Sequence, residues 1–264
     1  MPDPNPLPAA AQQRLGSEQA GKAFTSDLSV EEYVLLEQAG FDSLGLVMGT
    51  SIYHVGIQIA RWGQNQELTT LTNAMYQARI LAMQRMLIEA HTLGADGITG
   101  VKLGLHMYAW GQEVLEFTAM GTAIRFRAAP GTLRAPSGWP FSSDLSAREF
   151  YLLHQAGKWP VGLVMGVCVY HIAHQGVMQS LRQVGQNVEM PQFTNGIYEA
   201  RELALNRMQV EADQLQAQGV VGVDLTVANH VWGEHATEFF AVGTAVRPSG
   251  TTTQGATPTL VLPL

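Results

Sequence analysis

The sequence predicts an α+β protein built from two tandem two-layer α/β sandwich domains. The first observation is an internal repeat: residues 24–54 match residues 141–171 at 18 of 31 positions, and residues 73–124 match residues 195–246 at 24 of 52. Each copy spans about 105 residues, which is long enough to fold as one domain. Both copies also order their short apolar runs and their long amphipathic run in the same way, which indicates one shared architecture.

Each copy begins with a short helix. Ser29 is followed three residues later by Glu32, and Ser146 by Glu149. In such a capping box the serine accepts from a free backbone N–H, while the glutamate reaches back to the serine N–H. A glycine after each segment is expected to end the helix.

A strand follows each short helix. Residues 44–53 and 161–170 are apolar runs rich in valine and isoleucine. Their length fits a strand, and the lack of alternating polar residues predicts burial on both faces.

The long helix of each copy carries one apolar stripe, since its apolar residues recur every three or four positions. The stripe comprises Leu71, Met75, Ala78, Ala82, Met86 and Leu93 in the first copy, and Phe193, Ile197, Ala200, Ala204, Met208 and Leu215 in the second. Arg85 lies four residues before Glu89, and Arg207 four before Glu211. This spacing predicts ion pairs on the solvent side of each helix.

Two strands close each copy. They are predicted at residues 97–105 and 114–126 in the first copy, and at 219–227 and 236–246 in the second. A Trp-Gly pair lies between the two strands, where glycine tolerates a tight turn. The order helix, strand, helix, strand, strand predicts a long helix packed on an antiparallel or mixed sheet.

The repeat sets the expected domain boundaries. The first domain spans residues 24–127 and the second spans 141–247, joined by a linker at 128–140 with three prolines and two glycines. Residues 1–22 and 248–264 are rich in Pro, Gly, Thr, Ala or Gln, so we expect disordered tails there.

Composition excludes several classes of partner. The formal charge is -7 and no basic tract is present, so we expect no nucleic-acid partner. No apolar run reaches membrane-spanning length, and no basic start with an apolar core marks a secretory signal, so we expect a cytoplasmic protein without membrane insertion. The single cysteine, Cys168, cannot form a disulfide within the chain and is expected to be a small core residue.

Three short runs recur in both copies and carry a family resemblance. They read Ala78-Arg79-x-x-Ala82, Leu93-Gly94-Ala95-Asp96-Gly97-Ile98-x-Gly100-Val101 and Gly121-Thr122-Ala123 in the first copy, and Ala200-Arg201-x-x-Ala204, Gly219-Val220-Val221-Gly222-Val223 and Gly243-Thr244-Ala245 in the second. In this order they resemble the YbjQ-like family across both copies.

The resemblance implies a dodecin-like subunit fold and assembly of single domains into five-membered rings. Members are often labelled heavy-metal-binding proteins, and no defined activity comes with the family. This chain departs from the family pattern by its duplication, by the capped helix before each first strand, and by the Tyr-His that follows that strand.

No catalytic residue or cofactor is expected. The sequence has no Gly-x-Gly-x-x-Gly after a strand, no Walker loop, no Gly-x-Ser-x-Gly and no His-Glu-x-x-His. Glu116 and Glu238 are matched between the copies, and we interpret them as solvated or interface-paired strand residues. For Arg79 and Arg201 we favour an ion pair between subunits or a helix–sheet clamp over an anion site.

The pairs Tyr53-His54 and Tyr170-His171 are the candidate ligand or interface residues. Each pair follows an apolar strand. A Tyr-His pair could stack on a ligand or hydrogen-bond across a subunit interface. The alternative is a histidine that only caps a loop carbonyl.

Metal binding is the alternative function. Imidazole and carboxylate ligands suit zinc, nickel or copper. Candidate ligands, if there is a site, are His171, His174, His230 and His235. We expect no tightly bound metal, because the last three histidines have no histidine at the matching position of the first copy.

The function predicted from the sequence is therefore a non-enzymatic homo-oligomeric scaffold or ligand-binding protein, with the chain itself as its partner. We favour five chains in two stacked rings, each ring built from one copy. The alternative is that the two copies alternate within one layer.

Overall fold

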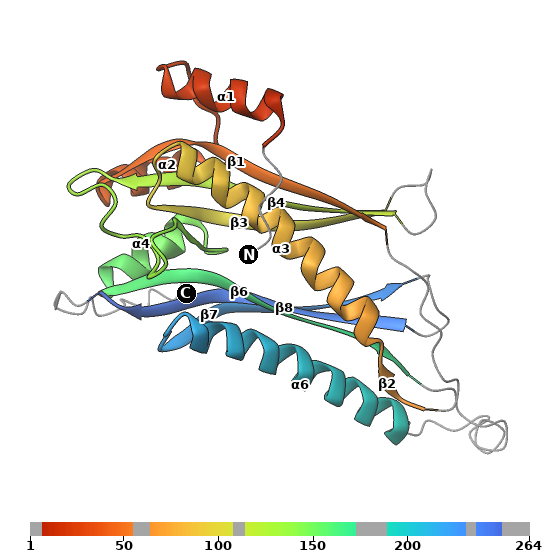
Figure 1. Cartoon of the computed structure of the whole chain (residues 1–264). Coiled ribbons are helices and arrows are strands. Elements are labelled where there is room, and N and C mark those ends of the chain that lie inside the picture. The colour runs from red at the N-terminus through yellow and green to blue at the C-terminus, as the bar shows by residue number, and fades with distance from the viewer. Residues whose placement is uncertain (1–6, 55–63, 108–113, 173–188, 231–235, 250–264) are drawn as a thin grey trace.

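The computed structural model describes residues 7–54, 64–107, 114–172, 189–230 and 236–249. Two four-stranded sheets lie one above the other, and each is accompanied by a long helix (Figure 1). No helix in these described ranges is both long enough and apolar enough to cross a bilayer. The α+β class and the tandem arrangement of two related units are confirmed.

The first copy supplies most of the first sheet. Its elements are α2 (Val30–Gln38), β1 (Phe41–His54), β2 (Gln66–Glu67), α3 (Thr69–Thr92), β3 (Gly97–Met107) and β4 (Val114–Phe126). An additional helix, α1 (Ala9–Gln19), precedes them.

The second copy repeats the order of the helices and the long strands. Its elements are β5 (Phe141–Ser142), α4 (Ala147–Gln155), β6 (Lys158–His171), α6 (Pro191–Gln214), β7 (Gly219–His230) and β8 (Ala236–Pro248). The predicted order of helix, strand, helix, strand, strand is confirmed in both copies, and both capping boxes are formed.

The two sheets exchange short strands. The first sheet has the order β1-β4-β3-β5, so β5 of the second copy pairs with β3 of the first. The second sheet has the order β2-β6-β8-β7, so β2 of the first copy pairs with β6 of the second. The long strands pair antiparallel and only β5 pairs parallel, which makes the first sheet mixed.

This strand exchange differs from two independent domains with the boundaries predicted from the repeat. A strand edge presents unpaired N–H and C=O groups, and a neighbouring segment can satisfy them. Here each copy satisfies such groups on the other, so neither sheet is made from residues 24–127 or 141–247 alone.

Helix α3 joins the two halves. It packs along β1 and β4 of its own sheet and reaches β6 of the other. Close approach to β1 depends on Gly49, where an added Cβ would lie 2.0 Å from the Ala82 carbonyl oxygen. Gly166 has the matching role beneath α6, with 1.8 Å to the Ala204 carbonyl oxygen. A close-packed helix–sheet layer thus requires glycine at both positions.

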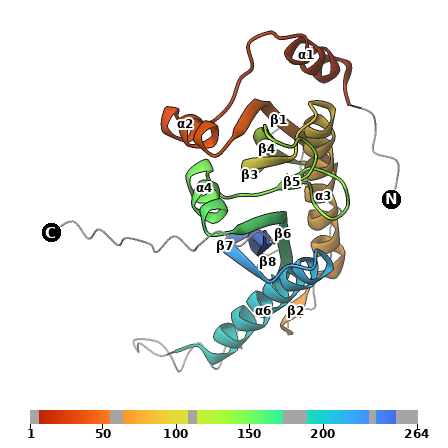
Figure 2. The same ribbon diagram turned by 90° about the vertical axis from the view of Figure 1, so that its left-hand side faces the viewer.

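A second contact joins the halves at the short helices. Helices α2 and α4 lie side by side (Figure 2). Beneath them Phe41 of the first copy packs with Phe150 and Trp159 of the second, at ring-centroid distances of 5.2 and 5.9 Å. Phe141 packs on the same two rings at 5.9 and 5.6 Å. Such aromatic contacts add to the free energy of burying the rings.

The predicted ion pairs along the long helices are wrong. Arg85 donates to the Thr50 carbonyl, and Glu89 accepts from Arg14 of α1. Arg207 pairs instead with Glu67 of β2. These side chains lie against strands and not on a solvated helix face, so tertiary partners replace the local i,i+4 pairing.

The expected disorder of residues 1–22 is also wrong for α1. Leu15 is buried in the core of the first copy, and Arg14 donates to Glu89 at 2.5 Å and to the Leu46 carbonyl at 2.8 Å. The Gln19 side chain also donates to the Thr92 carbonyl at 2.5 Å. A helix without a strong apolar stripe is thus stabilised by tertiary contacts with the first copy. The residues at 250–264 lie outside the described ranges.

The predicted linker is tied to the first copy. Asp96 accepts from the Gly131 N–H at 2.5 Å, and the Arg134 side chain donates to the Ala95 carbonyl at 3.2 Å. The indole N–H of Trp159 donates to the Leu133 carbonyl at 3.0 Å. These contacts fix the path that brings β5 back to the edge of β3.

Candidate functional site

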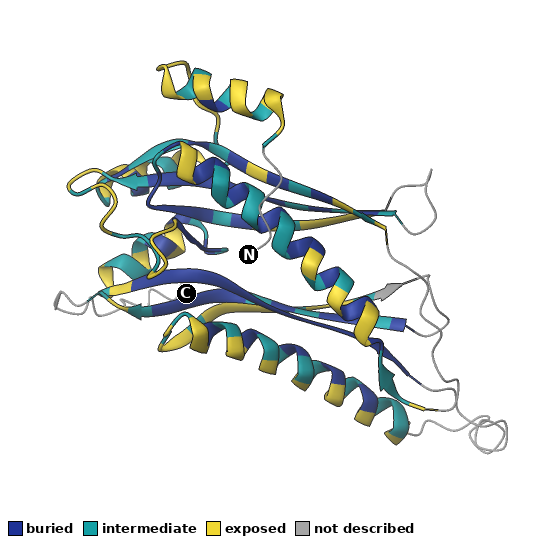
Figure 3. Cartoon of the chain, in the orientation of Figure 1, coloured by how far each residue is buried: buried dark blue, intermediate teal, exposed yellow. Residues whose placement is uncertain are grey.

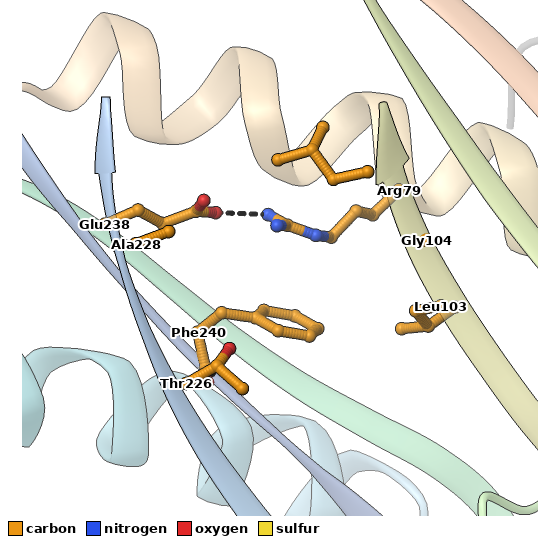
Figure 4. A pocket seen from close by; sticks show the side chains of 8 residues that line it. Arg79, Leu103, Gly104, Thr226, Ala228, Glu238 and Phe240 are labelled. Carbon is orange, nitrogen blue, oxygen red and sulfur yellow. Dashed lines mark hydrogen bonds and ion pairs between the residues drawn. The ribbon is translucent and has the colours of Figure 1, made fainter. Parts of the chain in front are cut away.

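A pocket of about 170 Å³ lies between the two copies (Figure 4). Helix α3 and strand β3 of the first copy form one side, and strands β7 and β8 of the second form the other. The lining residues are Arg79, Leu103, Gly104, Leu105, Thr226, Ala228, Glu238 and Phe240.

An ion pair between the copies crosses this pocket. Arg79 projects from α3, and its Nη1 lies 2.6 Å from Oε1 of Glu238 on β8. Both side chains are buried. The Arg79 guanidinium also lies 4.1 Å from the ring centroid of Phe240 and 5.1 Å from that of Phe117. A desolvated cation over aromatic faces gains further electrostatic attraction.

The geometry supports holding the copies together more than it supports chemistry. Of the described residues that line the pocket, Arg79 and Glu238 alone are ionisable, and each neutralises the other. The Thr226 hydroxyl donates to the Phe240 carbonyl at 3.5 Å, and the described lining residues include no titratable group beyond the Arg79–Glu238 pair. A general base within reach of a reacting proton is the minimum for acid–base catalysis.

A second ion pair joins the copies at the strand edge. Arg207 of α6 contacts Oε1 of Glu67 at 2.7 Å and Oε2 at 2.9 Å, while it also donates to the Val167 carbonyl at 2.6 Å. The hydrogen bond to Glu67 raises the pKa of Arg207 above its usual value. One side chain thus binds β2 of the first copy and β6 of the second.

The two Tyr-His pairs have different surroundings. Tyr170 and His171 are buried, and they lie opposite Glu67 and Gln66 of β2. The Tyr170 hydroxyl donates to Glu199 at 2.7 Å, and burial together with this carboxylate raises the pKa of Tyr170. Tyr53 is half-buried and His54 is exposed at the outer edge of the first sheet.

Arg201 and Glu116 correspond by sequence to Arg79 and Glu238, but the chain does not bring them together. Both are half-buried. Nε of Arg201 is buried and has no hydrogen-bond partner in the described part of the chain. Glu116 interacts with another group of its own chain.

The described residues hold no cluster of three potential metal ligands. His174 and His235 lie outside the described ranges, as does the side chain of His230. Cys168 is buried as expected, and burial raises its pKa to about 12. A thiol with so high a pKa is a poor metal ligand, because metals bind the thiolate.

Sequence reasoning missed Glu67 and Glu199. Glu67 and Glu189 are matched between the copies, which was the available signal that Glu67 has a role beyond solvation. Glu199 corresponds to Gln77 in the first copy, so the repeat gave no indication that it binds Tyr170.

Comparison with known proteins gives the family. A family model described as "Putative heavy-metal-binding", YbjQ_1, matches residues 35–127 and again residues 158–249. The Encapsulin nanocompartment protein Rv1762c of Mycobacterium tuberculosis is 52% identical over 258 residues, which cover 98% of this chain and 97% of the relative.

Shorter relatives match one unit. A UPF0145 protein of Halorubrum lacusprofundi is 39% identical over 92 residues, covering 33% of this chain and 86% of its own length. A UPF0145 protein of Pseudothermotoga lettingae is 35% identical over 91 residues, covering 33% of this chain and 84% of its own. With two family matches and the strand exchange between them, the chain belongs to the YbjQ family as a tandem duplication.

Proposed function

We propose that this protein is a non-enzymatic scaffold that assembles with copies of itself. The observation that carries the proposal is the contact between the two copies. It combines two exchanged strands with the ion pairs Arg79–Glu238 and Arg207–Glu67. A unit that covers its neighbour's strand edges is suited to repeated side-by-side association.

The relative from Mycobacterium tuberculosis, similar over nearly its whole length, is named an encapsulin nanocompartment protein. We infer from this similarity that the present chain also works with a protein compartment. We keep a cytoplasmic location and the absence of a nucleic-acid partner as part of this proposal, in line with the acidic composition.

The subunit number is proposed as five, from the rings that the family resemblance implies. The contact between the copies favours alternation within one layer over two stacked rings, because each copy lies beside the other kind. A ring closed through this contact contains an even number of units, so it departs from the five-membered rings of single domains that the resemblance implies. Five chains would form a ring of ten units.

Native mass spectrometry of the purified protein tests the proposal. We expect a single closed assembly of several chains at micromolar concentration. A monodisperse monomer would contradict the scaffold function. Co-expression with an encapsulin shell protein tests the compartment role, and we expect the two proteins to co-purify through size exclusion.

Metal binding is the second candidate, and it is favoured by the description of the matching family as heavy-metal-binding. His171 is the one candidate ligand whose side chain is described, and it is buried beside β2. Elemental analysis of protein prepared without a histidine tag tests this function. We expect less than one equivalent of zinc, copper or nickel per chain, and a full equivalent lost on His235→Ala would support the metal site.

A further inference from the structure

The contact between the two copies is asymmetric, because each copy contributes different elements to it. The first copy contributes the start of α3 and the free edge of β3. The second copy contributes β5 and the outer face of its sheet. In the described chain no equivalent contact with a sheet of the other copy is made by the start of α6 or by the edge of β7. The first copy's equivalents of β5 and of that face make none either.

The outer face of the first sheet is the surface left over on the first copy. We define it by Met48, Thr50 and Ile52 of β1 and by their partners Met120, Thr118 and Glu116 on β4. Met48 is 43% exposed, whereas its counterpart Met165 is 2% exposed. Ile52 is 59% exposed, and its counterpart Val169 is fully buried. The first sheet thus presents apolar residues to solvent where the second presents them to α3.

Helix α6 offers the matching surface on the second copy. Leu68, at the start of α3, is 4% exposed against β6, whereas its counterpart Met190 is 38% exposed. Leu71 and Met75 are buried, whereas their counterparts are only half-buried. The start of α6 therefore has the same apolar pattern as the start of α3, but among the described residues it covers no sheet of the other copy. The first copy contacts it there through the Asn65 amide, which donates to the Gln192 carbonyl at 3.2 Å.

The charges on the two left-over surfaces are complementary. Arg79 pairs with Glu238 inside the chain, and the repeat places Arg201 on α6 and Glu116 on the outer face of the first sheet. The contact of Glu116 within its own chain is compatible with a second partner, since a carboxylate accepts several hydrogen bonds.

The second ion pair between the copies, Arg207–Glu67, also has counterparts of both residues in the opposite copies. Arg207 pairs with Glu67 and donates to the Val167 carbonyl. Arg85 donates to the matching Thr50 carbonyl, with no acidic partner among the described residues. The counterpart of Glu67 is Glu189, which lies just before α6.

A glycine gives an independent indication. The Phe141 ring of β5 covers Gly97 so closely that an added Cβ would lie 2.2 Å from it. Gly219 repeats Gly97 on β7, yet no atom in the described part of the chain lies within 4 Å of a Cβ added there. The counterpart of Phe141 is Phe24, which is exposed. Phe24 and Gly219 thus correspond to the aromatic ring and the glycine of this contact, but the two do not meet in the described part of the chain.

We propose that a second copy of this chain docks here, with α6 of one chain on the outer face of the first sheet of the next. Arg201 pairs with Glu116 of the next chain, and Arg85 of that chain pairs with Glu189. Phe24 of the next chain lies over Gly219. This proposal rests on the scaffold function, and it makes the chain-to-chain contact a copy of the contact inside each chain.

Charge reversal tests the docking surface. Native mass spectrometry and sedimentation velocity are recorded for wild type, Arg201→Glu, Glu116→Arg and the double variant. We expect each single variant to weaken assembly by at least about a hundredfold, as for a broken interfacial charge pair, and the double variant to restore it. Circular dichroism confirms that each chain remains folded.

Gly219→Ala is the second variant. Its methyl group meets no atom of the described residues, so we expect an unchanged melting temperature of the separate chain but at least tenfold weaker assembly. A wild-type monomer would overturn both this docking surface and the scaffold function. A wild-type oligomer that survives both single charge reversals, or singles that the double variant fails to restore, would overturn the docking surface alone.

Discussion

Strands β1 and β6 have closely similar sequences and different surroundings. Both strands contain the run Gly-Leu-Val-Met-Gly, which starts at residue 45 in β1 and at residue 162 in β6, and both strands end in Tyr-His. Strand β6 is buried from Trp159 to its end, whereas β1 alternates buried and accessible residues (Figure 3). The difference arises because α3 and β2 of the first copy cover β6, while nothing in the described chain covers the matching part of β1.

This comparison shows that a strand sequence can be suited to a neighbour that is not part of its own chain. A strand with one face in solvent usually places polar residues there. Strand β1 keeps Met48 and Ile52 on its accessible face. Burial on both faces was predicted for both strands, and within one chain it is correct for β6 alone.

The largest effect should distinguish Arg79 from Arg201. We expect Arg79→Met to lower the free energy of unfolding by about 3 kcal/mol, since it leaves Glu238 buried without its cation. Arg201→Met should change it by less than about 0.5 kcal/mol. Both are compared by urea unfolding in a Glu116→Arg background, which the docking surface predicts to be monomeric. Equal losses for the two variants would contradict the asymmetry between the copies.

An intermediate effect should distinguish Glu211 from Glu89. Each accepts a backbone N–H, from Met165 or Met48, but only Glu89 also binds Arg14. Burial raises the pKa of Glu211 from 4.5 to about 7. The folded chain therefore holds this proton more tightly, so the associated stability is complete below pH 4.5 and is lost as pH rises through 7.

We accordingly expect Glu211→Gln to stabilise the protein at pH 8 by about 1 to 2 kcal/mol, with little effect at pH 4.5. Glu89→Gln should destabilise it at pH 8 by about 1 kcal/mol, because Arg14 loses its charged partner. Thermal unfolding across pH 4.5 to 8 measures both. Glu211→Gln without effect at pH 8 would show that the carboxylate is ionised there at no cost.

The smallest effect should distinguish the two tyrosines. Tyr170→Phe removes the hydrogen bond to Glu199 and should cost about 1 kcal/mol. Tyr53→Phe, at the accessible end of β1, should cost less than about 0.5 kcal/mol. Urea unfolding of the two variants side by side measures the difference, and a larger loss for Tyr53→Phe would reverse the comparison.

Much of the fold could be predicted from local sequence patterns. The capping boxes at Ser29 and Ser146, the long strands and the stripe on α3 follow from spacings within a few residues, and all are present. Strand exchange could not be read in this way. A two-residue strand has no periodicity, and its partner is chosen by the path of the chain and not by local sequence.

The candidate site could likewise be predicted from the sequence only in part. The repeat identified Arg79 and Glu238 as matched residues suited to an interface ion pair, but it could not say that they pair with each other across 159 positions. It also gave no reason to separate them from Arg201 and Glu116. Helix α1 was missed because its stability comes from Arg14 and Leu15, two contacts that no local pattern reveals.

A paired cross-link shows whether the contact between chains copies the contact within each chain. The Leu68 N–H donates to the Val169 carbonyl at 2.8 Å within the chain, and the repeat makes Met190 and Ile52 their counterparts between chains. Cysteines are introduced at one pair or the other in a Cys168→Ser background, since the first copy has Ser51 at that position. Each protein is treated with a short thiol cross-linker and run on a denaturing gel.

We expect Leu68→Cys with Val169→Cys to give a cross-linked single chain. Met190→Cys with Ile52→Cys should give a ladder of covalently joined chains that neither single cysteine gives. If the Met190 and Ile52 pair yields only uncross-linked single chains while wild type remains an oligomer, the contact within the chain is not the template for contacts between chains.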